Sequence, residues 1–306
     1  MRPVPVIHWD EVEVEEAGEV AHMRAMWRDL GRPAGSVGGS VNRVQVAPGC
    51  RSTPVHQHFH EEETFFVLGG SGLSWQDGKL HELGPGDVVL HRAGEEAHTV
   101  VAGDDGIDFL VFGAEPPSPV TFLPRARVMR TGGSWVDYEP DSTHPFEREP
   151  ADLPGELAPR PDTIVAVEEG PAERIAHGRS GFTRRKVGLH LGALTTGFQH
   201  VTVEAGMESW PPHCHSADEE VFVVLDGEGS VVLGDEEVPV RRGSVVARPP
   251  ATGVPHHFTG PVTYLAWSLD GANDMAWYPR SRKVSLRGLG IRFHVEPVEY
   301  WDGESS

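Results

Sequence analysis

The sequence predicts an all-β protein made of two copies of one domain, and two observations lead to this prediction. Short runs of β-branched and aromatic residues alternate with Gly, Pro and Asp turn residues, in a chain with 36 Gly and 26 Pro. Distinctive residues also recur at a constant offset of 157 residues, as Gly49 does with Gly206 and His56 with His213. Repeated short strands are typical of tandem sandwiches or small barrels, and 306 residues suit two such domains.

The repeat keeps its register over most of each copy. The further pairs are Pro54 with Pro211, His58 with His215, Glu62 with Glu219, Glu63 with Glu220, Phe65 with Phe222, Gly70 with Gly227, Gly72 with Gly229 and Gly86 with Gly243. The second copy then gains one residue, so that His98 pairs with His256. So many special residues in one register indicate a duplicated domain.

Six short strands are predicted in each copy. In the first copy they are 40–47, 64–68, 73–76, 87–91, 98–101 and 107–112, and in the second 198–204, 221–225, 230–233, 238–241, 244–248 and 263–268. One segment, 17–30, is predicted as a helix, because Val20, Met23, Trp27 and Leu30 recur at helical spacing.

The remaining segments complete the predicted organisation. The chain divides into an N-terminal segment that packs on a barrel, a first domain, a Pro-rich connector, a second domain and a C-terminal segment, at 1–39, 40–115, 116–161, 162–270 and 271–306. Ten prolines in the connector predict an extended strap over the surface. Four aromatic residues, Trp277, Tyr278, Tyr300 and Trp301, predict that the C-terminal segment packs against a barrel.

Charge and composition exclude several classes of function. With 26 Lys and Arg against 46 Asp and Glu, the net charge of −20 disfavours nucleic acids and anionic membranes as partners. No apolar run approaches the length of a membrane span, and no signal peptide is recognisable near the start. Cys50 and Cys214 are too few for a disulfide framework. We therefore expect a cytoplasmic protein with a small-molecule substrate.

A metal-ligand pattern occurs once in each copy. His56 and His58 are two residues apart, so on a strand both imidazoles point to the same face. Glu63 begins the next strand on the face of Phe65, and His98 follows later. Three imidazoles and one carboxylate suit a divalent first-row metal and leave positions open for water, substrate or O2. The second copy repeats the set as His213, His215, Glu220 and His256.

Several ligand assignments have alternatives. In the run Glu61-Glu62-Glu63 we select Glu63 because the register of the following strand favours it, and His60 competes with His56 for one position. In the second copy His257 could replace His256, because the loop before it is one residue longer. Cys214 lies between two of the ligands, and strand alternation turns it to the opposite face.

Three further residues are candidates for a supporting role around the ligands. His91 and Arg248 occupy equivalent positions in the repeat. If they face inward, they could bind a substrate carboxylate or orient a metal ligand, and the alternative is a salt bridge at the rim. His60 or His91 could also supply a base for proton transfer.

These motifs resemble those of a known family. Gly49, His56, His58, Glu63 and Gly69-Gly70 resemble the first cupin motif, and Gly84-Pro85-Gly86-Asp87 through His98 resembles the second. Gly206, His213, His215, Glu220 and Gly227, followed by Gly243 through His256, match in the second copy, except that Ser244 stands where an Asp is usual. The chain resembles a double cupin (bicupin), most closely a bacterial group without a settled activity.

The resemblance implies two jelly-roll β-barrels, each with a metal at its centre, and a homodimer formed through exchanged terminal strands. We expect one or two divalent ions per chain, with iron favoured and manganese, zinc, nickel or copper as alternatives. An Fe(II) site predicts a dioxygenase-like enzyme acting on a small diol, enol or carboxylate. The alternatives are a manganese, zinc or nickel isomerase or decarboxylase, and a non-catalytic protein that binds a small molecule through its metal.

Overall fold

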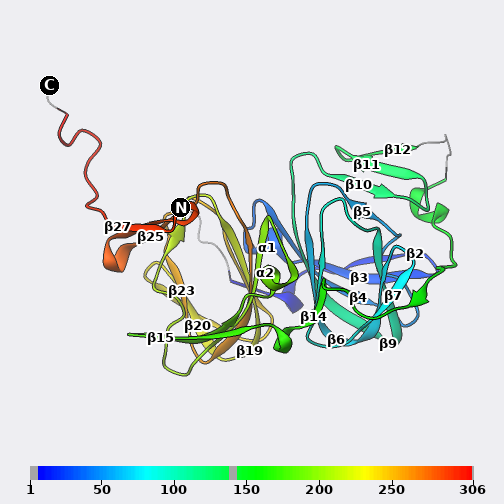
Figure 1. The fold of residues 1–306 in the computed structure, drawn as a ribbon, viewed down its shortest axis with the longest axis horizontal. Helices are drawn as coiled ribbons and strands as arrows, with labels where there is room; N and C mark the ends of the chain where they lie inside the picture. The colour runs from blue at the N-terminus through cyan, green and yellow to red at the C-terminus, as the bar shows by residue number, and fades with distance from the viewer. Residues whose placement is uncertain (1–5, 138–142, 305–306) are drawn as a thin grey trace.

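The computed structural model describes residues 6–137 and 143–304, which form two β-barrels side by side (Figure 1). This architecture confirms the predicted fold class. The helices are all short: α1 Gly31–Ala34, α2 Val187–Leu191 and the 3-10 turns Trp9–Glu11, Pro145–Arg148, Val167–Glu169, Pro279–Ser281 and Arg287–Leu289. None of the helices in the described ranges has the length and apolar character needed to cross a membrane.

Barrel 1 is built around a nine-stranded sheet. Its strands are β2 Glu15–Val20, β3 Met23–Asp29, β4 Gly39–Val46, β6 Glu63–Gln76, β7 Lys79–Leu83, β8 Asp87–His91, β9 His98–Ala114, β13 Glu156–Leu157 and β14 Ile164–Ala166. Strands β6 and β9 each join two of the predicted strands, because bulges near Gly70 let them bend and continue. Gly70 has a positive φ of 77°, and a Cβ there would collide with the Gly106 carbonyl.

Barrel 2 repeats this arrangement in a seven-stranded and a three-stranded sheet. The first sheet contains β1 Ile7–His8, β15 Ala172–His177, β16 Ser180–Arg185, β17 Thr196–Val203, β19 Glu219–Gly227, β22 Ser244–Arg248 and β24 Val262–Leu269. The second contains β20 Gly229–Leu233, β21 Glu236–Val240 and β23 His256–Thr259. The strand β23, which begins at a predicted metal ligand, is not among the predicted strands.

A four-stranded sheet extends from the wall of each barrel. In barrel 1 it consists of β5 Gln57–His58, β10 Val120–Leu123, β11 Val128–Thr131 and β12 Ser134–Asp137, and in barrel 2 of β18 Cys214–His215, β25 Met275–Tyr278, β26 Lys283–Leu286 and β27 Ile291–His294. The C-terminal segment therefore joins barrel 2 through residues 275–294, whereas Tyr300 and Trp301, two of the four aromatic residues behind the prediction, are exposed. The connector is more than an extended strap, because three of its strands pair in register onto the edge of β5.

The predicted helix at 17–30 is wrong. This segment forms the antiparallel pair β2 and β3, and β3 pairs with β4 along the edge of the barrel 1 sheet. Met23 and Ala25 are buried while Arg24 and Met26 are exposed, which is the alternation of a strand. The hydrogen bonds offered by the neighbouring sheet edge outweigh the helical spacing of the apolar residues.

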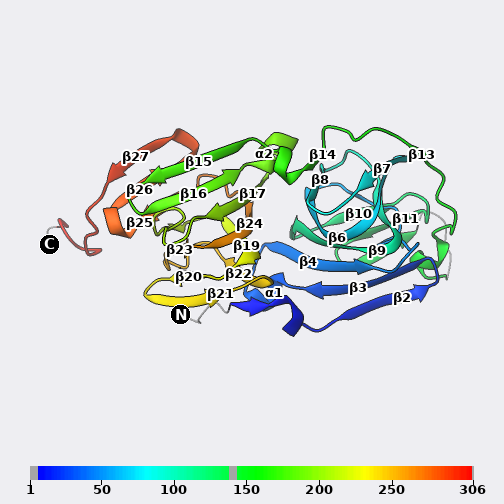
Figure 2. The ribbon, with the colours of Figure 1, turned by 90° about the horizontal axis from the view of Figure 1, so that it is seen from below.

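The two halves of the chain exchange their first strands. Strand β1 precedes barrel 1 in the chain but pairs with β22 of barrel 2, whereas β14 precedes barrel 2 but pairs with β8 of barrel 1 (Figure 2). Ile7 pairs with Val245, and Val165 pairs with Val88, the repeat partner of Val245, so Ile7 and Val165 occupy equivalent positions in the two exchanged strands. Each barrel is thus completed by chain that belongs to the other half.

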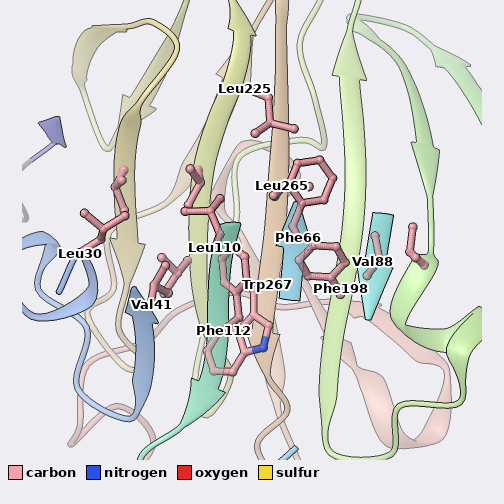
Figure 3. Close-up of a cluster of buried hydrophobic side chains, with 14 of the residues drawn as sticks. Leu30, Val41, Phe66, Val88, Leu110, Phe112, Phe198, Leu225, Leu265 and Trp267 are labelled. Carbon is pink, nitrogen blue, oxygen red and sulfur yellow. The ribbon is translucent and has the colours of Figure 1, made fainter. Parts of the chain in front are cut away.

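The strands that face the other barrel are buried on both sides. In β6, Phe65 and Val67 lie in the interior of barrel 1, and Phe66 lies in the cluster between the barrels. In β19, Phe222 and Val224 lie inside barrel 2, whereas Val221 and Val223 face barrel 1. Figure 3 shows this shared cluster, in which Leu110 and Phe112 of β9 approach Trp267 of β24. Burial on both faces explains the unbroken apolar runs in the sequence.

Two buried glutamates fasten the barrels to each other. Glu62 of barrel 1 accepts hydrogen bonds from the backbone amides of Leu194, Thr195 and Thr196 and from both threonine hydroxyls. Its repeat partner Glu219 accepts from the hydroxyl and amide groups of the equivalent loop in the first half, at Ser36, Val37, Gly38 and Gly39. The pair is reciprocal, so the interface has approximate twofold symmetry.

Candidate metal centres

In barrel 1 the four predicted ligands lie together at the inner wall. The Oε2 atom of Glu63, the first residue of β6, lies 3.1 Å from His98 Nε2 and 3.3 Å from His58 Nε2. His56 Nε2 is 3.8 Å from the same oxygen. One donor atom from each of the four residues lies within 4.8 Å of all the others. The turn before β5 and the backbone pairing of His56 with His98 bring these chain segments together.

The other ring nitrogen of each barrel 1 histidine points away from this centre. Nδ1 of His56 lies 3.0 Å from the Pro54 carbonyl, Nδ1 of His58 lies 2.7 Å from Glu61 Oε1, and Nδ1 of His98 lies 3.4 Å from the Glu96 carbonyl. Each of these oxygens accepts a hydrogen bond when Nδ1 carries the proton. That tautomer leaves the Nε2 lone pair facing Glu63, as a metal ligand requires.

In barrel 2 the second set of predicted ligands has a similar but looser arrangement, because only three of its four donor atoms lie within 4.8 Å of one another. Glu220 Oε2 lies 3.0 Å from His256 Nε2 and 3.5 Å from His215 Nε2. His213 belongs to the same cluster, because its donor atom lies within 4.8 Å of those of Glu220 and His256. Nδ1 of His213 lies 2.9 Å from the Pro211 carbonyl, which repeats the contact of His56 with Pro54.

The electrostatics of both clusters favour a cation at the centre. Burial lowers the pKa of His98 and of His213 to about 3, so both imidazoles are neutral at pH 7. Burial would raise the pKa of Glu63 and of Glu220, but the surrounding histidines hold both pKa values well below the usual range. Burial would also lower the pKa of His58, but Glu63 and Glu61 raise it to about 10. Without a metal, protons supply the positive charge.

The donor sets fit a divalent transition metal. Within the described chain, His215 Nε2, His256 Nε2 and Glu220 Oε2 are buried and lack a hydrogen-bond partner of good geometry, although they face one another. Unsatisfied buried polar atoms are costly, and an ion bound between them would satisfy all three. Three imidazole nitrogens and one carboxylate oxygen suit iron, manganese, zinc, nickel or copper.

The structure places the alternative ligands elsewhere. Glu61 binds the outer nitrogen of His58, and Glu62 serves the inter-barrel contact, which leaves Glu63 at the centre. His60 is exposed and lies outside the cavity of barrel 1, so it neither joins the cluster nor supplies a base there. His257 lines the barrel 2 cavity but lies 4.0 Å from Glu208 and outside the group of donor atoms around Glu220. Cys214 is buried in the wall opposite Trp277, as strand alternation predicts.

His91 and Arg248 are buried behind the ligands and form no rim salt bridge. The His91 ring stacks on His98 with ring centroids 3.6 Å apart, and its Nδ1 lies 2.7 Å from Glu96 Oε1. Arg248 donates a hydrogen bond of 2.7 Å to the Val254 carbonyl and so holds the loop that carries the extra residue. Neither side chain lines a cavity, so of the predicted roles the orientation of a ligand fits His91 best.

Each cluster opens into a cavity of a size suited to a small organic molecule. The barrel 1 cavity has a volume of about 380 Å³, and Trp27, Phe65, Phe109 and Val111 form its apolar wall. The barrel 2 cavity has a volume of about 420 Å³ and is lined by four cations, Arg184, Lys186, Arg287 and Arg292. Both clusters of predicted metal ligands are therefore accessible to a small molecule in the cavity, as a reactive centre requires.

Two contributors to the barrel 2 site were not predicted from the sequence. Asp274, in the C-terminal segment, lies with its Oδ2 atom 2.7 Å from Nδ1 of His215 and so orients that ring. Tyr278 stacks on His213 with centroids 5.5 Å apart and lines the cavity. Both residues lie about 60 positions beyond the histidines they touch, and no local pattern connects them. Only the run of aromatic residues in 271–306 pointed to this segment.

Comparisons with known proteins agree with the fold. The model of the cupin domain matches the chain twice, at residues 42–112 and 199–267. The chain is similar in fold to oxalate decarboxylase from Bacillus subtilis at pH 4.6, with a TM-score of 0.58 and 17% identity over 88% of this chain and 77% of that one. A point mutant of the same Bacillus subtilis enzyme gives a TM-score of 0.58 and 16% identity over 88% and 78% of the two chains. No curated protein matches the sequence.

Proposed function

Because the chain is a double-cupin protein, we propose that it is a metalloenzyme that holds a divalent transition-metal ion in each barrel and acts there on a small organic substrate. The observation that carries this proposal is the pair of ligand clusters, each of which faces a cavity. The barrel 1 cluster has four members, and the barrel 2 cluster consists of His213, Glu220 and His256 with His215 Nε2 3.5 Å from Glu220. Structural histidines would not need to direct several Nε2 atoms at one carboxylate oxygen in both barrels, three at Glu63 and two at Glu220. A bound ion would polarise a chelating substrate and hold it beside a second reactant.

The chain's own residues prepare this centre. Glu61 and Asp274 fix the rings of His58 and His215, and the Pro54 and Pro211 carbonyls fix those of His56 and His213. Prepared ligands bind a metal without reorganisation. The apolar wall of barrel 1 excludes water from one side of a bound substrate, which strengthens polar contacts within the cavity.

We propose an O2-dependent, dioxygenase-like reaction as the first candidate activity. Four protein ligands leave positions open for a substrate and a second small reactant, and the cavities have room for both. Small diols, enols and 2-oxo acids can present two oxygens to one ion, so they are the substrate class to test. Iron is the metal that suits this chemistry.

Decarboxylation of a small carboxylate is the second candidate, and the lining of barrel 2 supports it at least as well. Its cations would attract a carboxylate substrate. Tyr278 reaches the same cavity, and burial raises its pKa, so its hydroxyl keeps a proton at neutral pH that it could deliver to a substrate carbon. The similarity in fold to oxalate decarboxylase is compatible with this reaction.

The test begins with elemental analysis of the protein purified without added metal. Protein reloaded with Fe(II) or Mn(II) is then incubated with catechols, 2-oxo acids and small dicarboxylates while O2 uptake and CO2 release are followed. O2 uptake would support the oxygenase, and CO2 release without net O2 uptake the decarboxylase. A chain that takes up metal but turns over none of these compounds would favour a non-catalytic binding protein, and a chain that takes up no metal would overturn the proposal.

A further inference from the structure

The sheet beside each metal centre carries a row of paired residues that begins at a metal ligand. In barrel 2, His215 pairs with Ala276 of β25, Ala276 with Ser285 of β26, and Ser285 with Arg292 of β27. Residues paired in this way across antiparallel strands project from the same face of the sheet. All four residues line the barrel 2 cavity, so the row runs from the metal centre along its wall to a guanidinium group.

Barrel 1 has the same row with its arginine in another place. His58 pairs with Thr121 of β10, and Thr121 pairs with Arg130 of β11. These three residues also line their cavity. The next residue in the row is Trp135 of β12, and its ring lies 5.9 Å from the guanidinium carbon of Arg130. The arginine is thus two strands from the ligand in barrel 1 and three strands from it in barrel 2.

This difference sets two distances. Adjacent strands lie about 4.8 Å apart, so the Cα atom of Arg130 is roughly 10 Å from that of His58, and the Cα atom of Arg292 is roughly 14 Å from that of His215. Ala276 and Ser285 are small and leave the space between the metal centre and Arg292 open. In barrel 1 the arginine itself occupies the position of Ser285.

Both guanidinium groups are available to a ligand. The other two arginines of the barrel 2 cavity already form ion pairs. Arg184 pairs with Glu173, and Arg287 pairs with Asp218. Within residues 6–137 and 143–304, neither Arg130 nor Arg292 forms an ion pair. Both side chains are exposed, and a cation without a carboxylate partner at the edge of a cavity, in a protein of net charge −20, can bind an anionic group.

We propose that Arg130 and Arg292 are specificity-determining residues that each bind the far anionic end of a two-ended acid whose near end reaches the metal centre. Because Arg292 is one strand further from its centre, barrel 2 takes the longer acid. The inference rests on the proposed function only in that the near end binds a metal. A carboxylate or a phosphate could form the far end, because a guanidinium group accepts either in a bidentate contact.

The test measures binding rather than turnover. The full chain is loaded with Co(II), whose visible spectrum changes when a carboxylate enters its coordination, and titrated with linear dicarboxylates of increasing length. His213→Ala leaves only the barrel 1 centre loaded, and His56→Ala leaves only that of barrel 2. We expect the tightest-binding diacid to be longer for the His56→Ala protein than for the His213→Ala protein. Phosphonocarboxylates of equal length show which far end is preferred.

The arginine variants identify the far contact. In the His56→Ala protein, Arg292→Gln should weaken the preferred diacid about tenfold, because a charge-assisted contact is lost, and should leave acetate binding unchanged. Arg130→Gln should do the same in the His213→Ala protein. Lys186→Gln is the matched control, because it removes a cation from the barrel 2 cavity outside the row. It should weaken all anions alike without shifting the preferred length.

Two results would overturn the inference while the metal centres stand. One is the same preferred length in both barrels, and the other is an equal loss of acetate and diacid binding in Arg292→Gln. If the chain takes up no metal, the proposed function fails instead. Calorimetric titration of the metal-free protein with the diacids then tests the arginines alone, and binding that is absent or indifferent to Arg292→Gln would exclude their role.

Discussion

Barrel 1 and barrel 2 share one set of ligands but support it by different means. Glu61, two residues before the glutamate ligand, orients His58 in barrel 1. Its repeat partner Asp218 lies 3.9 Å from His215 Nδ1, accepts a hydrogen bond from the Gly271 amide and pairs with Arg287. Asp274 takes over the orienting contact in barrel 2. The two copies of the domain thus have the same predicted ligands but differ in the residues that orient them.

The same contrast holds for the segment that covers each barrel. Arg51 of barrel 1 pairs with Glu149 of the connector at 2.9 Å. Its repeat partner Glu208 pairs with Arg280 of the C-terminal segment at 2.6 Å. The two anchors are equivalent in position but opposite in charge. This buried position can therefore hold a residue of either charge, provided that the covering segment supplies a residue of the opposite charge.

Substitution of a ligand in one barrel is the strongest test of their independence. His56→Ala should remove one metal equivalent from barrel 1 and leave barrel 2 loaded, and His213→Ala should do the reverse, because each cluster lies in its own barrel. Elemental analysis of the two purified variants measures this. Two full equivalents in either variant would refute the ligand assignment.

Among these variants, substitution of an inter-barrel glutamate should lower the free energy of unfolding the most. Glu62→Gln and Glu219→Gln each break hydrogen bonds between a buried carboxylate and several donors, so we expect each to lower the free energy of unfolding by about 3 kcal/mol. Denaturant titration measures the effect, and the exposed Glu236→Gln is the control. Because the contacts of the two glutamates are reciprocal, we expect the two variants to lose similar amounts of stability. A large loss in only one of them would contradict this expectation.

Removal of the orienting carboxylates should weaken metal binding to a smaller extent. Glu61→Gln should lower the metal affinity of barrel 1, and Asp274→Asn that of barrel 2, each by about 10- to 100-fold, because the outer nitrogen of a histidine ligand loses its carboxylate. Competition with a chelator gives both affinities. Asp218→Asn is the matched comparison and should have less effect on affinity; an effect equal to that of Asp274→Asn would contradict the assigned contact.

The smallest effect concerns the anchor of the C-terminal segment. Burial would raise the pKa of Glu208, but Arg280 and neighbouring cations lower it below its usual 4.5. The folded state therefore favours the ionised form, and this stabilisation is present above pH 4.5 and is lost as the pH falls through the lowered pKa.

Arg280→Gln should then reduce the free energy of unfolding by about 1 kcal/mol at neutral pH, since the arginine is partly exposed, and by less in acid. Denaturant titrations of the wild type and the variant at about pH 7 and about pH 4 give the two differences. A difference that grows toward low pH would have the wrong sign for this ion pair.

Sequence alone predicted the candidate ligands and the duplication of the domain. His56 and His58 share a face because strand geometry is local, and the constant offset of 157 residues favours His56 over His60, because the second copy has no histidine two places after His215. The apolar runs around Phe65 and Phe222 fixed the register of the strands that begin at the glutamates. Short-range periodicity and an internal repeat need no knowledge of distant contacts.

Only the tertiary structure decided what surrounds the ligands. Segment 17–30 forms strands instead of the predicted helix because β3 pairs with the edge of β4. Asp274, Tyr278 and Arg292 reach barrel 2 because the C-terminal segment pairs with β18. The exchange of β1 and β14 depends on sheet edges more than 70 residues away in the chain. Such contacts arise when an unpaired edge or a buried charge finds its partner during packing, and no local pattern in the sequence encodes that choice.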